Sequence, residues 1–176
     1  HIGPVVPALF DRAFAGHGRL EWCQHGFGFV GLTLLREPHR EQARRFFIDA
    51  WRKHRAREVV SPLEDAAIRL VAQHPEYHDL LDSAEDALAR EWTPASGEAN
   101  PFLHLSLHLA IEEQLAIDQP PGLRTAFEAL LARRGDRHDA LHEVLECLGE
   151  TLWRAQKSQS PPDGEAYLDC LRRRLG

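Results

Sequence analysis

The stretch NPFLHLSLHLAIEEQLAIDQPPG, residues 100–122, decides the fold class of this chain. Its first two residues, Asn100 and Pro101, form a strong helix start. An asparagine side chain accepts hydrogen bonds from free backbone N–H groups, and proline has no N–H to satisfy. Apolar residues then recur at helical spacing, and the Pro-Pro-Gly sequence at the end stops the helix. We therefore predict a long apolar helix between these two signals.

Helix signals continue on both sides of this stretch. Ser61-Pro62-Leu63-Glu64 has the sequence of a capping box, in which the serine and the glutamate satisfy free N–H groups at a helix start. No segment alternates between apolar and polar residues for long enough to predict a strand. We predict an all-α fold, a single-domain helical bundle of five or six helices over residues 36–176. The other helices are expected at about residues 38–57, from Ser61 onward with a restart or bend at Pro75, from Leu123 to Gly135, at about residues 137–156, and after Ser160-Pro161-Pro162.

Residues 1–35 differ from the rest of the chain. They contain six of the twelve glycines and lack the apolar periodicity of a helix. We predict a loose N-terminal extension here, either native or derived from the expression vector, and we assign it no function.

Composition narrows the classes of function. With 43% apolar and 27% charged residues, the chain resembles an ordinary globular protein. A net charge of −6 gives no positive field for nucleic acid, and no apolar run is long enough to span a membrane. The three cysteines, Cys23, Cys147 and Cys170, are odd in number and lack CxxC spacing, which argues against a disulfide framework and a cysteine zinc site. We expect a cytoplasmic protein, and leave homo-oligomer formation and the substrate open.

Histidines carry the chemical signal. Six of them lie beyond residue 60, and all six form pairs four residues apart: His74 and His78, His104 and His108, and His138 and His142. Residues four apart on a helix share a face, so two imidazoles at this spacing can converge on one cation.

The two later pairs are expected to face the interior, because they share helix faces with leucines and isoleucine. A buried imidazole without a partner costs about 1–3 kcal/mol, and a metal ion would satisfy it. Glu112 follows His108 and Glu146 follows His142, which extends both pairs to HxxxHxxxE. Inward-facing histidine and glutamate from several helices are the ligands of bundle-core di-iron and di-manganese centres. The predicted metal ligands are His74, His78, His104, His108, His138, His142, Glu112 and Glu146.

A structural interpretation of the same residues stays open. His74 would cap a helix at Pro75 and His78 would pack one turn later. The other four histidines would then be core residues bonded to glutamates or backbone carbonyls. Cys147 is expected to be a small buried core residue.

The motifs HPEYH (74–78), NPFLHLSLHLAIEEQLAIDQPPG (100–122) and HDALHEVLECLGETLW (138–153), with Arg40-Glu41-Gln42 through Phe46-Phe47, resemble the bacterial domain of unknown function family 1841. The resemblance covers about residues 36–174 and implies a fold but no activity. A looser similarity of architecture links the chain to haemerythrin-like metal-binding bundles. Their ligand order of His, HxxxE, HxxxH and HxxxxD is absent here, so we do not expect oxygen carriage.

Three functions remain open from the sequence. The favoured hypothesis is a metal-binding bundle with a dinuclear non-haem iron or manganese centre and redox or oxygen chemistry. Iron is preferred to zinc, because the set offers more than four N/O ligands and no thiolate, and manganese and zinc are the alternatives. The second hypothesis is a mononuclear zinc or nickel hydrolase or transferase with three histidine ligands. The third is a non-enzymatic interaction protein with a buried histidine network, including a pH sensor as a variant.

Overall fold

The computed structural model describes residues 40–93 and 96–176, and these residues form eight α-helices and one short 3₁₀-helix, η2. No strand occurs in these two ranges, which confirms the all-α prediction. In chain order the elements are α3 (Arg40–Arg55), α4 (Pro62–Ala72), η2 (Pro75–Tyr77), α5 (His78–Asp82), α6 (Ala84–Ala89), α7 (Pro101–Ile117), α8 (Leu123–Arg134), α9 (Arg137–Ser158) and α10 (Gly164–Leu175).

The predicted count of five or six helices is wrong. Residues 78–89, whose second half carries no clear helical pattern, form the two short helices α5 and α6. They are separated at Ser83, whose backbone leaves the helical region at φ −112° and ψ 74°. Helices this short have no amphipathic period of their own, so they form because tertiary packing stabilises them.

The predicted helix starts are present. Ser61 and Glu64 make both hydrogen bonds of the capping box at the start of α4. The side chain of Asn100 accepts hydrogen bonds from the backbone N–H groups of Phe102 and Leu103, and Asp136 caps α9 through the N–H of Asp139. Each cap satisfies N–H groups that would otherwise lack a partner in the first turn.

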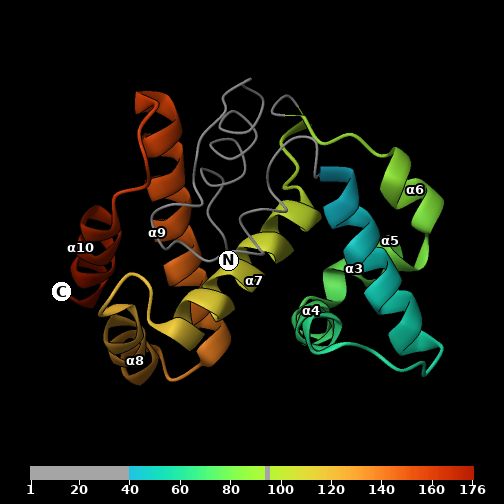
Figure 1. The fold of residues 1–176 in the computed structure, drawn as a ribbon, viewed down its shortest axis with the longest axis horizontal. Coiled ribbons are helices and arrows are strands. Elements are labelled where there is room, and N and C mark those ends of the chain that lie inside the picture. Colours follow the sequence, from blue (N-terminus) through green and yellow to red (C-terminus); the bar gives the residue numbers. More distant parts are fainter. Residues whose placement is uncertain (1–39, 94–95) are drawn as a thin grey trace.

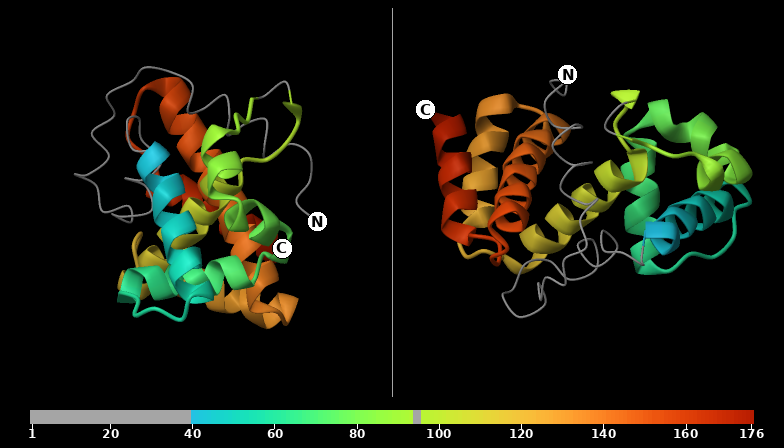
Figure 2. Two further views of the ribbon diagram at one scale, coloured as in Figure 1. Left: turned by 90° about the vertical axis from the view of Figure 1, so that its right-hand side faces the viewer. Right: turned by 90° about the horizontal axis from the view of Figure 1, so that it is seen from above.

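Helix α7 lies between two groups of helices. Figure 1 shows it crossing the middle of the molecule, with α8, α9 and α10 on one side and α3 to α6 on the other. The view from above in Figure 2 shows the same separation. We call α3 to α6 with η2 the N-terminal lobe, and α8 to α10 the C-terminal lobe.

Each lobe has its own hydrophobic core, and α7 supplies residues to both. Phe102, Leu105 and Leu109 pack with the N-terminal lobe. Leu107 and Ile111 pack with the C-terminal lobe. Because both sides of α7 are covered, the helix is apolar nearly all round, as is typical of a buried helix.

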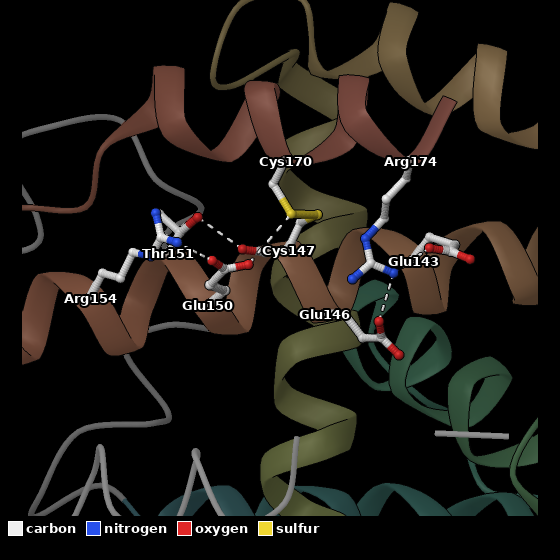
Figure 3. Close-up of a disulfide and its surroundings, with 8 residues drawn as sticks. All are labelled: Glu143, Glu146, Cys147, Glu150, Thr151, Arg154, Cys170 and Arg174. Atoms are coloured by element: carbon white, nitrogen blue, oxygen red, sulfur yellow. Dashed lines mark hydrogen bonds and ion pairs between the residues drawn. A yellow bond between two sulfur atoms is a disulfide. The ribbon is translucent and has the colours of Figure 1, made fainter. Parts of the chain in front are cut away.

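A disulfide joins Cys147 of α9 to Cys170 of α10, as Figure 3 shows. The expectation that the chain has no disulfide is therefore wrong. The two Cα atoms are 5.7 Å apart, and both side chains are buried, as expected for Cys147. The sequence spacing gave no signal for this pair, because the cysteines lie on different helices and meet only when α9 and α10 pack together.

The predicted N-terminal extension over residues 1–35, which includes Cys23, lies outside the described residues. Within the described ranges, no helix is both long enough and apolar enough to cross a membrane.

Replacing both Cys147 and Cys170 with alanine should lower the free energy of unfolding by about 3 kcal/mol, because the cross-link restricts the unfolded chain between them. Chemical denaturation of the oxidised protein, the reduced protein and the double variant measures this loss. The reduced protein should be about as unstable as the variant, since both lack the covalent bond. Equal stability of all three forms would contradict this role of the disulfide.

Candidate metal centre

Five histidine side chains meet where α7 passes between the two lobes. Helix α7 contributes His104 and His108, which are buried and one turn apart, with ring centroids separated by 4.7 Å. Neither histidine is part of either hydrophobic core. The Asn100 cap and Pro101 determine where this helix begins, so both imidazoles lie on a regular helix and not on a loop.

The N-terminal lobe contributes His74, which lies between the end of α4 and η2. Its ring centroid is 4.9 Å from that of His104 and 4.8 Å from that of His108. His74 is the N-cap residue of η2, as predicted, but its side chain makes no cap hydrogen bond. Its Nδ1 instead lies 2.7 Å from the carbonyl oxygen of Leu70.

The C-terminal lobe contributes His138 and His142 from the first two turns of α9. These two half-buried rings are 4.2 Å apart. The ring of His138 lies 4.7 Å from that of His74, and the ring of His142 lies 5.0 Å from that of His108. The cluster therefore combines side chains from both lobes and from the helix between them.

The nitrogen atoms of these rings converge. His74, His108, His138 and His142 each offer one ligand atom, and these four atoms lie within 4.8 Å of one another. Nε2 of His104 is 3.1 Å from Nε2 of His74 and 3.2 Å from Nε2 of His108. We call these five residues the histidine cluster.

Hydrogen bonding determines which ring nitrogen is free in two members of the cluster. A carbonyl oxygen only accepts, so Nδ1 of His74 must donate its proton to Leu70, which leaves Nε2 with a lone pair. Nδ1 of His138 lies 3.2 Å from Oε1 of Gln73, and the same reasoning leaves Nε2 of His138 free. Partners of this kind orient metal-binding histidines in many proteins.

Burial favours the uncharged form of four rings in the cluster, those of His74, His104, His108 and His142. Loss of water contact is the largest cause that lowers the pKa of His104 to about 3 and the pKa of His142 to about 4. Neighbouring histidines lower both values further, since one charged imidazole disfavours another. The pKa values of His74 and His108 are lowered by burial as well. Neutral imidazoles are the form that binds metal ions.

Two nitrogen atoms of the cluster lack hydrogen-bond partners. Nδ1 of His108 and Nε2 of His142 are both buried, and neither has a partner among the described residues. An unsatisfied buried polar atom costs about 1–3 kcal/mol. The cluster therefore retains unused capacity for a ligand.

Three residues predicted as ligands lie outside the cluster. Nε2 of His78 lies 2.9 Å from the carbonyl oxygen of Val71, and the ring packs on Trp51. Glu112 forms a two-pronged ion pair with Arg137, with N···O distances of 2.7 and 2.9 Å.

Glu146 is 2.7 Å from Arg174 of α10 (Figure 3). The HxxxHxxxE spacing placed it two turns from His138, which is too far along α9 for both to bind one ion. Glu112 is equally distant from His104 along α7. Both carboxylates are already neutralised by arginines.

Two neighbours of the cluster were not predicted from the sequence. Gln73 contacts His138 as described above. Tyr77 stacks on His74 with a centroid separation of 5.5 Å, and burial raises the pKa of Tyr77 to about 12. Glutamine and tyrosine at these positions carry no spacing signal, although Gln73 directly precedes the HPEYH motif and Tyr77 lies within it.

The family model described as Domain of unknown function (DUF1841) matches residues 39–173. The chain belongs to this family. The resemblance inferred from the histidine motifs is thereby confirmed, and all five members of the histidine cluster lie within the DUF1841 match. No curated protein and no solved structure shows significant similarity to the chain.

Without metal, stability should decrease as the pH falls from about 6.5 to about 4. In this range His142 binds a proton when the chain is unfolded, but its lowered pKa keeps it neutral in the folded protein, so acid favours unfolding. Denaturation in a chelator between pH 8 and pH 4 measures the slope. His142→Gln removes one titrating group and should flatten the slope. An unchanged slope in this variant would contradict the lowered pKa.

Proposed function

We propose that this protein binds one divalent transition-metal ion in the histidine cluster between its lobes. The observation that carries the proposal is the convergence of five imidazoles from three separate segments, with buried nitrogen atoms that lack partners. Burying such groups together without a ligand is unfavourable.

The absence of carboxylates from the cluster favours a mononuclear centre. Bundle-core di-iron and di-manganese sites use several glutamates, and here the two predicted glutamates pair with arginines. Imidazole ligands suit zinc, copper, nickel and iron, whereas manganese prefers oxygen ligands. We therefore place zinc, nickel or iron(II) above the dinuclear iron or manganese centre that the sequence favoured.

The spacing of the ring nitrogens supports the same conclusion. Ligand atoms around a tetrahedral zinc ion at about 2.0–2.1 Å are about 3.3 Å from one another. Nε2 of His104 is 3.1 and 3.2 Å from Nε2 of His74 and of His108, so each of these two pairs has about the separation of two ligands on one ion. Nδ1 of His74 is bonded to the backbone carbonyl of Leu70, and Nδ1 of His138 is bonded to the side-chain amide of Gln73. In each ring the Nε2 lone pair therefore points away from this hydrogen-bond partner.

The chemistry that fits this ligand set is Lewis-acid activation of water, as in a metal-dependent hydrolase or transferase. Neutral ligands leave the full positive charge on the ion, which polarises a bound water or carbonyl. His138 and His142 are only half-buried, so solvent reaches the cluster from the side of α9.

A buried histidine network is the second candidate function. It is favoured by one observation, the chain of contacts from His74 through His104 to His108. Such a chain could hold the N-terminal lobe to α7 through hydrogen bonds alone and serve an interaction protein. Metal content separates the two functions.

Untagged protein should bind about one equivalent of Zn²⁺, Ni²⁺ or Fe²⁺ per chain, measured by elemental mass spectrometry after loading and gel filtration. His74→Gln and His142→Gln should each weaken binding at least tenfold, because each removes one ligand. His78→Gln is the matched control, since His78 belongs to the same sequence motif but lies outside the cluster; it should bind as the wild type does.

The absence of bound metal in the wild type would overturn the proposal and favour the histidine network. Equal losses in His78→Gln and His74→Gln would also overturn it, because the metal would then depend on histidine content and not on the cluster.

A further inference from the structure

Gln73 connects the two lobes at the edge of the histidine cluster. It is the C-cap residue of α4, and its Oε1 lies 3.2 Å from Nδ1 of His138 on α9. The amide oxygen can only accept, so the proton of this hydrogen bond belongs to Nδ1 of His138. The contact fixes both the orientation of the ring and the nitrogen that stays unprotonated.

The backbone holds Gln73 in place for this contact. Its N–H donates to the carbonyl oxygen of Leu70 at 3.1 Å, and the N–H of His74 donates to that of Val71 at 2.9 Å. The same carbonyl of Leu70 also accepts from Nδ1 of His74. The end of α4 therefore carries two groups for the cluster, the His74 ring and the amide that orients His138.

His138 needs such a partner more than the two histidines of α7 do. It lies in the first turn of α9, and its side chain is half-buried, whereas His104 and His108 are enclosed by the protein. A half-buried ring at a helix start has rotamers that point to solvent, and it can carry its proton on either nitrogen. A single hydrogen bond from the opposite lobe removes this freedom.

We propose that Gln73 is a positioning residue for the metal centre, which holds His138 with Nε2 directed into the cluster. The inference rests on the proposed metal-binding function. Gln73 touches no reacting atom, and it acts through His138. Because its amide is neutral, it orients the ligand without adding negative charge, so the positive charge of the ion is retained at the centre.

Gln73→Leu should weaken Zn²⁺ binding by about 10- to 100-fold, the usual effect of removing a hydrogen-bond partner of a metal ligand. Gln73→Glu should restore binding at least to the wild-type level, because a carboxylate accepts the same hydrogen bond more strongly. The control Gln156→Leu changes a glutamine at the other end of α9 and should bind Zn²⁺ as the wild type does. Competition with a chromophoric chelator measures all four affinities.

Nitrogen-15 NMR of the metal-free protein provides a second readout that does not depend on Zn²⁺. In the wild type and in Gln73→Glu, His138 should carry its proton on Nδ1. In Gln73→Leu it should shift toward the Nε2–H form that predominates in free histidine. A structural role for Gln73 would not move this tautomer.

Wild-type affinity in Gln73→Leu, or equal losses in Gln73→Leu and Gln156→Leu, would overturn the proposal. Failure of Gln73→Glu to restore binding would do the same. If the wild type itself binds no Zn²⁺, the metal-binding function fails, and the NMR result alone then decides whether Gln73 orients His138.

Discussion

The convergence of five imidazoles at one junction, three of them buried and two half-buried, is the constraint on which the rest of this structure depends. Loss of water contact lowers the pKa values of His74, His104, His108 and His142, and neutral rings present lone pairs to one another. A hydrogen bond needs one donor and one acceptor, and His74 has already given its Nδ1 proton to a backbone carbonyl. The cluster thus contains more acceptors than protons. A bound cation would accept the lone pairs that have no proton to bind. The proposed function therefore rests on the hydrogen bonds of the cluster as well as on its histidine content.

The two-lobed fold explains how such a site can be built. Helix α7 is apolar on nearly all sides because each lobe covers part of it. Its two histidines belong to neither core and lie between the lobes. The N-terminal lobe brings the end of α4 to this place, and the C-terminal lobe brings the start of α9. The disulfide between α9 and α10 fixes α9 within its own lobe. An ion bound in the cluster would therefore join α7 to the end of α4 and to the start of α9, which belong to different hydrophobic cores.

The sequence predicts the long helices well, because caps and apolar periods are local signals. The capping box at Ser61 and the Asn100 cap are both present. It predicts α5 and α6 poorly, since helices this short depend on packing. The four-residue spacing identified all five cluster members, but it could not separate them from His78, because η2 lies between His74 and His78 and the two residues do not share one α-helix. The predicted glutamate ligands instead pair with Arg137 and Arg174. Each arginine lies on a different helix from its glutamate, so residue spacing along one helix could not predict these pairs.

X-ray absorption spectroscopy of the Zn²⁺-loaded protein tests the central claim most directly, because it counts and identifies the ligands around the ion. We expect one ion with four or five nitrogen neighbours at about 2.0–2.1 Å and the multiple scattering typical of imidazole rings. We expect no second metal at about 3.5–4 Å. A coordination shell dominated by carboxylate oxygen, or a clear metal–metal distance, would contradict an all-histidine mononuclear centre.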